Sequence, residues 1–219
     1  NGFSVIRDLP NDLANTLNSL GVSLYTVGRF EDALEHFTDS LNIALQIGAT
    51  RRAAFVQASI GDVLLERQEY EPALAAFAAS TNLAQEAGIR PLEIYNQVKT
   101  GEAYYRQNDL ARALKRVNQA REVAIETGLT FELGLASLLQ AKLYVRRGEY
   151  AASFKLFAEA VACFAQSNRL EEAKARLWWA YSLLLDLQTS AAFDQLQQVL
   201  RLALTMGELI QGLNTTTGA

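Results

Sequence analysis

A 40-residue repeat constrains the fold of this chain more than any other feature. Gly21 returns as Gly61 and Gly101, so one landmark already fixes the spacing. Such a period identifies an array of stacked supersecondary units, because each unit can bury its apolar face only against its neighbours. Arrays of this kind usually present surfaces for binding. The same period relates Phe37 to Phe77, Val117 and Phe157, Ala33 to Ala73, Ala113 and Ser153, and Gly48 to Gly88 and Gly128.

Each repeat reads as a pair of helices. Leu13, Leu17, Leu20 and Leu24 are spaced by four, three and four residues, which places them on one helix face before Gly28 interrupts the pattern. A second helix follows with acidic residues in its first turn, where they interact favourably with the helix dipole. The sequence therefore predicts an all-α array of antiparallel helix pairs. The predicted helices are 11–27 with 30–47, 50–67 with 70–87, 90–107 with 110–127, 130–147 with 150–167, and 170–186 with 189–206.

We interpret residues 11–206 as one helical repeat domain, in which the last repeat is degenerate, as a terminal repeat usually is. Residues 1–10 form a lead-in that is either the tail of a preceding helix or a strand-like segment. Residues 207–219 form a C-terminal cap or a disordered tail, and Leu209, Ile210 and Leu213 are expected to pack on the last repeat. Because the chain starts at Asn1 rather than Met, we expect it to be a fragment of a longer protein. The five repeats are 11–47, 50–87, 90–127, 130–167 and 170–206.

Composition excludes several classes of function. A net charge of −4 and a pI near 5.2 are opposite to the basic surface that holds a phosphate backbone, so direct nucleic-acid binding is not expected. No apolar run reaches the ~18 residues that a membrane span needs. A single cysteine, Cys163, allows no internal disulfide and agrees with a reducing compartment. We therefore expect a soluble, cytoplasmic protein without membrane contact.

The repeated residues resemble a known family. Gly21, Ala33 and Phe37, with an aromatic residue or leucine at the position of Phe30, look like the glycine, alanine and phenylalanine signature of the tetratricopeptide repeat. The resemblance covers roughly residues 11–206. The period is 40 rather than 34, as in the lengthened repeats of Pins/LGN scaffold proteins and of bacterial regulators similar to the maltose-regulon activator. The resemblance implies a right-handed superhelical solenoid whose first helices line a concave groove.

The groove implied by the resemblance supplies the candidate site. Mapped position by position, it begins with Asn15, Asn18, Val22 and Tyr25 and is apolar and aromatic with a few charges. Such a lining suits an amphipathic helix or an extended peptide with aliphatic anchors. The alternative is that some of these side chains are buried between neighbouring helices. The candidate peptide-binding residues are Phe55, Asp62, Tyr95, Val98, Lys99, Glu102, Tyr105, Arg106, Leu138, Lys142, Arg146, Trp178 and Tyr181.

Charged residues recur at helical spacing along the predicted groove. Asp62 and Glu66 lie one turn apart, Glu102 and Arg106 repeat that spacing one unit later, and two basic residues, Lys142 and Arg146, follow. One interpretation is a charge gradient that orients a partner. The other is ordinary intrahelical pairing, worth ~0.2–0.5 kcal/mol for each pair.

No set of residues predicts catalysis. His36 is the only histidine, and a lone histidine makes neither a metal site nor a triad. Cys163 occupies the position of Ile43 and is expected in the core, so no nucleophile, metal site or cofactor is predicted. A basic stripe on one second helix, usually a solvated face, contains Arg112, Lys115, Arg116 and Arg121. Trp178 falls at an exposed position and is either a partner contact or covered by the end of the chain, whereas Trp179 is expected in the core.

The sequence thus predicts a non-catalytic protein-protein interaction module that binds a peptide or partner segment in its concave groove, as part of a larger signalling or transcriptional regulator. The alternative is a small-ligand sensor domain of a bacterial transcription activator. A peptide needs a groove that is open along its length, whereas a small ligand needs a closed pocket of about 300–1,000 Å³. Neither the partner nor the oligomeric state follows from the sequence.

Overall fold

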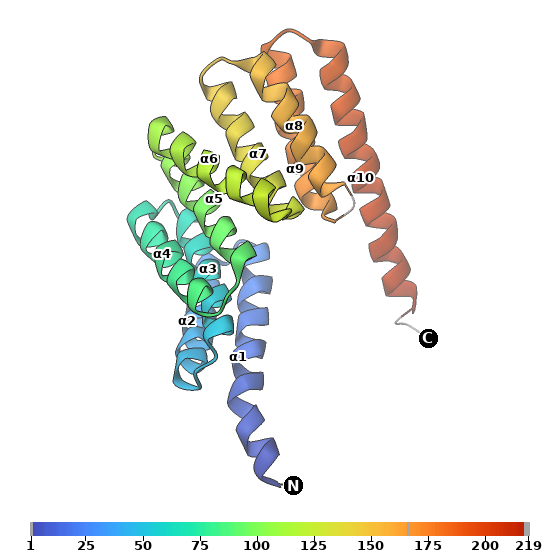
Figure 1. Cartoon of the computed structure of the whole chain (residues 1–219). Coiled ribbons are helices and arrows are strands. Elements are labelled where there is room, and N and C mark those ends of the chain that lie inside the picture. The colour runs from blue at the N-terminus through green and yellow to red at the C-terminus, as the bar shows by residue number, and fades with distance from the viewer. Residues whose placement is uncertain (1, 166, 217–219) are drawn as a thin grey trace. The chain divides into compact units, whose positions relative to one another are not determined.

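The computed structural model describes residues 2–165 and 167–216, and the side chains of residues 9–165 and 167–205. The described chain is helical apart from short turns and contains no strand, which confirms the all-α prediction. Successive helices run back and forth as hairpins (Figure 1). The helices are α1 (Gly2–Thr26), α2 (Phe30–Gln46), α3 (Thr50–Glu66), α4 (Tyr70–Glu86), α5 (Arg90–Arg106), α6 (Leu110–Thr127), α7 (Thr130–Arg146), α8 (Tyr150–Phe164), α9 (Arg169–Leu185) and α10 (Thr189–Thr216).

The inner helices begin where the repeat predicts. Helices α2 to α8 and α10 start at the predicted residue, and α9 starts one residue earlier. The two terminal helices are longer than predicted, because α1 begins at Gly2 and α10 continues to Thr216. Residues 2–10 are thus helical and continuous with the first pair, and residues 207–216 continue the last helix. The side chains of Leu209, Ile210 and Leu213 lie outside the described residues.

The chain divides into two compact units, Asn1–Gln119 and Ala120–Ala219, which we call unit 1 and unit 2. In unit 1, each helix from α1 to α4 packs against the next. In unit 2, α7 packs on α8, α8 on α9, and α9 on α10. The division falls within α6, at a position that the 40-residue period does not mark.

The repeated glycine and phenylalanine form a single packing device. A Cβ atom added to Gly61 would lie 2.6 Å from Cε1 of Phe77, and one added to Gly21 would lie 2.7 Å from the ring of Phe37. Phe37 and Phe77 are 1% and 0% exposed. In these two repeats the phenylalanine of the second helix therefore lies directly on the glycine of the preceding first helix, which is why the two residue types recur together.

Backbone hydrogen bonds close the turns between helices. After α2, the Gly48 N–H donates to the Leu45 carbonyl at 3.2 Å and the Ala49 N–H to the Ala44 carbonyl at 2.8 Å, with Gly48 at φ +69°. This is the Schellman arrangement, which requires a left-handed residue after the helix. The same bonds follow α9, where Leu187 occupies the left-handed position at φ 60°.

The left-handed turn residues give a stability prediction. Replacing Leu187 by glycine should raise the free energy of unfolding by ~0.5–1 kcal/mol. Glycine relieves the ~1–2 kcal/mol of strain that leucine has in the left-handed conformation, but part of this gain is lost because glycine gives the unfolded chain more conformational entropy. Leu187 is 87% exposed, so little packing is lost. Urea unfolding monitored by circular dichroism measures the change. The reverse substitution at the matching position after α2, Gly48→Ala, should lower stability by a similar amount, and a fall for both variants would contradict the argument.

Candidate functional site

A set of charged side chains connects two first helices of unit 1. The Tyr95 hydroxyl on α5 donates to an Asp62 carboxylate oxygen on α3 at 2.5 Å. Lys99 Nζ lies 3.3 Å from the other Asp62 oxygen and 3.4 Å from a Glu102 oxygen. The Lys99, Asp62 and Glu102 side chains are only 17–20% exposed. These groups are therefore held in place largely out of solvent.

Arg106 extends the same set along both helices. Its guanidinium donates to both carboxylate oxygens of Glu66 on α3, at 2.8 and 3.2 Å, and to Glu102 on α5 at 3.1 Å. It also donates to the Leu65 carbonyl at 3.3 Å. We call Asp62, Glu66, Tyr95, Lys99, Glu102 and Arg106 the charge network.

The charge network contains the intrahelical pairing that the spacing suggested and, in addition, pairs between two helices. Lys99–Glu102 and Glu102–Arg106 lie within α5, but Asp62–Lys99 and Glu66–Arg106 join α3 to α5. Glu66 and Arg106 stand 40 residues apart, one full repeat. The charges therefore bind neighbouring repeats together rather than forming a simple gradient.

Burial and charge shift the pKa values of this region. Burial raises the pKa of Tyr25 to about 12, and the nearby Asp62 carboxylate adds to the rise. Burial alone would lower the pKa of Lys99, but attraction to Asp62 and the surrounding acids raises it well above its ordinary value. Burial raises the pKa of Asp62, opposed by Lys99 and the Tyr95 hydrogen bond. Lys99 therefore keeps its proton at neutral pH as the cation of a paired site.

These shifts predict a loss of stability at alkaline pH. The Tyr25 phenol ionises near pH 10 in the unfolded chain but near 12 in the folded one, so unfolding releases a proton between these values and the free energy of unfolding falls. A lysine with a raised folded pKa likewise stabilises the fold fully below its unfolded pKa and loses that contribution above it. We expect the melting temperature to fall between pH about 10 and about 12, and less steeply in Tyr25→Phe. Equal slopes in the wild type and in Tyr25→Phe would contradict the prediction.

Three of the candidate residues are buried between helices. Val98, Tyr105 and Leu138 are 4%, 8% and 9% exposed. They follow the alternative of burial that the sequence left open. In particular, the expectation that Tyr105 lines the groove is wrong, because its ring is part of the interior.

The candidates on unit 2 form a separate group. Lys142 Nζ lies 4.8 Å from the centroid of the Trp178 ring, and Trp178 meets Tyr181 edge-to-face at 5.8 Å. Arg146 is exposed, and Tyr181 is 48% exposed. Trp178 is thus half-buried by Lys142 and Tyr181, and it contacts the cluster of α7, α8 and α9. Trp179 is also half-buried and packs in the core clusters of unit 2.

An open hollow lies beside α1 and the start of α3 in unit 1. Its volume is about 590 Å³, and Phe55, which is 44% exposed, forms part of the lining. The Arg51 guanidinium lies 5.9 Å from the Phe55 ring centroid, and Arg52 donates a hydrogen bond to Asn11. The remaining lining residues are Asn15, Asn18, Gly48, Ala49 and Thr50.

Sequence reasoning placed Asn15, Asn18 and Phe55 at this surface but missed the two arginines. Arg51 and Arg52 stand in the first turn of α3, which contains no acidic residue. The available signal was the pair of adjacent arginines itself, because acidic rather than basic residues suit a helix N-terminus, as Glu31 does in α2 and Glu93 in α5. No ion pair involves either arginine among the described residues.

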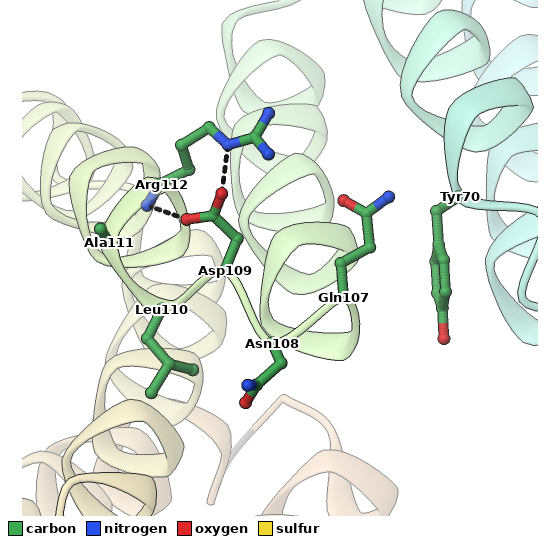
Figure 2. A pocket seen from close by; sticks show the side chains of 7 residues that line it. All are labelled: Tyr70, Gln107, Asn108, Asp109, Leu110, Ala111 and Arg112. Atoms are coloured by element: carbon green, nitrogen blue, oxygen red, sulfur yellow. Dashed lines mark hydrogen bonds and ion pairs between the residues drawn. The ribbon is translucent and has the colours of Figure 1, made fainter.

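A second hollow, of about 790 Å³, surrounds the turn between α5 and α6 (Figure 2). Asp109 accepts a hydrogen bond from the Arg112 backbone N–H at 2.9 Å and pairs with its guanidinium. The backbone N–H of Arg112, followed by its side chain, lowers the pKa of Asp109. Arg112 also lies 4.5 Å from the Tyr104 ring centroid. Asp109 and Arg112 already interact with each other at the start of α6, so this hollow is a weaker candidate for binding a partner.

Two residues of the predicted basic stripe of α6 make ion pairs within the fold. Besides Arg112, Arg121 makes a bidentate ion pair with Glu159 on α8, with bonds of 2.8–3.2 Å, and Ser137 donates to the same carboxylate. Lys115 and Arg116 are exposed. Arg112 is exposed as well, so the stripe is a solvated face at every position except Arg121.

The remaining reactive groups do not form a site. Among the described residues, no three histidine, cysteine, aspartate or glutamate side chains gather as metal ligands would. Cys163 is half-buried, and burial raises the pKa of its thiol. His36 is also half-buried rather than fully solvated. Within the part of the chain that the structure describes, no helix is both long and apolar enough to cross a bilayer.

Comparison with known proteins supports the fold. Residues 12–86 match the tetratricopeptide repeat family, a stretch that covers the first two helix pairs. No curated protein sequence is significantly similar to the chain. Solved structures are similar at low identity, which shows the shared fold: the chain has the tetratricopeptide-like arrangement of consecutive helix pairs.

Three of these structures cover most of the chain. The nearly identical TPR-like repeats of a Podosopora anserina kinesin light chain protein align over 91% of this chain and 98% of theirs, at 14% identity and a TM-score of 0.61. A Rap protein complexed with competence and sporulation factor covers 85% of this chain and 53% of its own, at 12% identity and a TM-score of 0.76. The Rap conjugation gene regulator of plasmid pLS20, in complex with the Phr peptide, covers 85% and 52%, at 13% identity and a TM-score of 0.75.

Proposed function

We propose that this chain is a non-catalytic protein-protein interaction module, and that an extended peptide segment of its partner binds in the hollow between α1 and α3. The observation that carries the proposal is the lining of this hollow. An exposed aromatic ring, Phe55, lines the hollow together with the amides of Asn15 and Asn18, and the Arg51 guanidinium lies 5.9 Å from its centroid. The exposed Asn15 amide offers a donor and an acceptor, as a peptide backbone requires, and the ring provides an apolar anchor.

The charge network lies along the same face of α3 as Phe55. Phe55, Asp62 and Glu66 are spaced by seven and four residues and so lie along one face of α3. Asp62 and Glu66 are tied to α5, which holds that face of α3 in place before a partner arrives. A preformed surface binds more tightly because less conformational entropy is lost on binding. The Rap structure solved with the Phr peptide shows that a protein of this fold holds a peptide, which supports the same role here.

We further propose that the module belongs to a larger cytoplasmic signalling or transcriptional regulator and works without a cofactor, nucleic acid or membrane. The lengthened repeat, which resembles those of Pins/LGN scaffolds and maltose-regulon-type activators, supports this setting. So does the partial coverage of the two Rap proteins, of which the chain spans about half. A small-ligand sensor remains the competing function, but the hollow is open to solvent, whereas small-ligand pockets enclose most of their ligand.

Selection of peptides on the purified chain, followed by titration calorimetry, tests the proposal. Phe55→Ala should weaken a selected peptide by about 2 kcal/mol, or roughly thirtyfold, because a central aromatic anchor is lost. Arg51→Ala should weaken acidic peptides most and should flatten their salt dependence. The control is Arg116→Ala, at an exposed residue of α6 away from the hollow.

Phe55 and Arg51 are both exposed, so the two variants should have the melting temperature of the wild type. Peptides that bind Phe55→Ala and the wild type equally would show that the hollow is not the site. Selection of no peptide, together with a small molecule that shifts the melting temperature, would favour the sensor function instead.

A further inference from the structure

Two arginine side chains at the hollow between α1 and α3 have no acidic partner among the described residues. Arg51 is exposed, and Arg52 is half-buried. The first turn of α3 contains no acidic residue, and neither arginine forms an ion pair with any residue whose side chain the structure describes. The carboxylate of Glu86 accepts a hydrogen bond at 3.4 Å from Thr50, which lines the hollow, and not from an arginine. In a chain of net charge −4, the described part thus holds two neighbouring cations without a counter-charge.

The two guanidinium groups keep most of their hydrogen-bond donors for a ligand. A guanidinium has five N–H donors in one plane. Arg52 uses one of them on the side-chain oxygen of Asn11, a contact that joins α3 to α1 and holds the Arg52 side chain at the hollow. A carboxylate suits the remaining donors, because its two oxygens match the planar fork of an arginine.

The distance from Arg51 to Phe55 sets the spacing of the anchors on a bound peptide. The central guanidinium carbon of Arg51 lies 5.9 Å from the centroid of the Phe55 ring. In an extended peptide, adjacent side chains point to opposite sides, and side chains two residues apart point to the same side, about 6.6 Å from each other. An acidic residue that reaches the arginines therefore places the residue two positions away on the ring, whereas the adjacent residue points away from it.

We infer that the partner peptide carries an aspartate or glutamate two residues from a large apolar residue, with the carboxylate held by Arg51 and Arg52 and the apolar side chain on Phe55. The inference rests on the proposed peptide-binding function of the hollow and adds which peptides the hollow selects. Because the carboxylate belongs to a side chain, the peptide need not end at the hollow.

Selection from a library of random displayed peptides, with the purified chain as the target, tests the inference. Peptides that lose binding to Phe55→Ala should be enriched in aspartate or glutamate two positions from a large apolar residue. Moving the acidic residue by one position should weaken such a peptide by about tenfold, because its charged hydrogen bonds to the arginines are lost. Arg51→Gln/Arg52→Gln should weaken the original peptide by the same factor and should remove most of its dependence on salt.

Lys115→Gln/Arg116→Gln is the matched control, since it removes two positive charges from exposed positions on α6. It should bind the peptide as the wild type does. Both double variants should keep the melting temperature of the wild type, because glutamine at position 52 still has a donor for Asn11.

Two results would overturn the inference and leave the peptide-binding function of the hollow in place. One is a set of peptides that depend on Phe55 but show no acidic preference at this spacing. The other is equal binding to Arg51→Gln/Arg52→Gln and to the wild type. Selection of no peptide, or of peptides that bind Phe55→Ala as tightly as the wild type, would overturn the proposed function and the inference together.

Discussion

Replacing Phe77 by alanine should lower the free energy of unfolding by ~3–5 kcal/mol, the largest effect expected of any single substitution in unit 1. The side chain is 0% exposed, and its ring fills the space above Gly61 within the main core cluster of α2, α3 and α4. Truncation leaves a cavity between two helices whose backbones are already close, so the surrounding structure has little room to collapse. Urea unfolding followed by far-ultraviolet circular dichroism measures the change as a lower midpoint.

Phe193 provides a control of the same residue type. It lies on another second helix but is 60% exposed, so Phe193→Ala should change stability by no more than ~0.5 kcal/mol. Similar losses at Phe77 and Phe193 would mean that the register of the repeat, and with it the packing of phenylalanine on glycine, is wrong.

The second large effect is expected from Lys99→Met. Removal of this ammonium leaves Asp62 and Glu102 partly buried without their shared cation, and breaking such a pair costs ~3 kcal/mol or more. The double variant Asp62→Asn/Lys99→Met should recover part of that loss, because no unpaired charge then remains at that point. A double-mutant cycle from thermal or urea unfolding gives the coupling energy directly.

An exposed ion pair of similar length is the matched comparison. Lys174 lies 2.7 Å from Glu171, but its side chain is 52% exposed, so Lys174→Met should cost no more than ~0.5 kcal/mol. If Lys99→Met cost as little as Lys174→Met, the charge network would contribute nothing to stability beyond an ordinary surface pair.

Most of the fold was predictable because residues that pack in the same way recur at a fixed spacing. Glycine at 21 and 61 permits close approach, and phenylalanine at 37 and 77 fills the resulting space, so the helix boundaries follow from the spacing. The end helices were predicted less well, because their outer turns have no neighbouring repeat to impose a pattern. The division within α6 was not predictable, since the 40-residue period continues through it.

The candidate site was predictable only in part. The sequence pointed to Asp62, Lys99 and Arg106 as charges on first helices, and the structure brings them into one network in unit 1. Spacing along one helix shows only intrahelical partners, so it suggested Glu102–Arg106 but not the pairs between α3 and α5. Burial of Tyr105 was not predicted, because the groove positions came from the family pattern rather than from the packing of these particular helices.

The ion pairs between α3 and α5 affect how unit 1 unfolds. In a linear array, unfolding can begin at an end and proceed one repeat at a time, with a cost set by each repeat and by its interface to the next. Asp62–Lys99 and Glu66–Arg106 skip the helix between them and add to the interface rather than to either repeat. The second and third repeats should therefore exchange their amide hydrogens as one cooperative block, while the outer turns of α1 exchange through separate, less costly fraying.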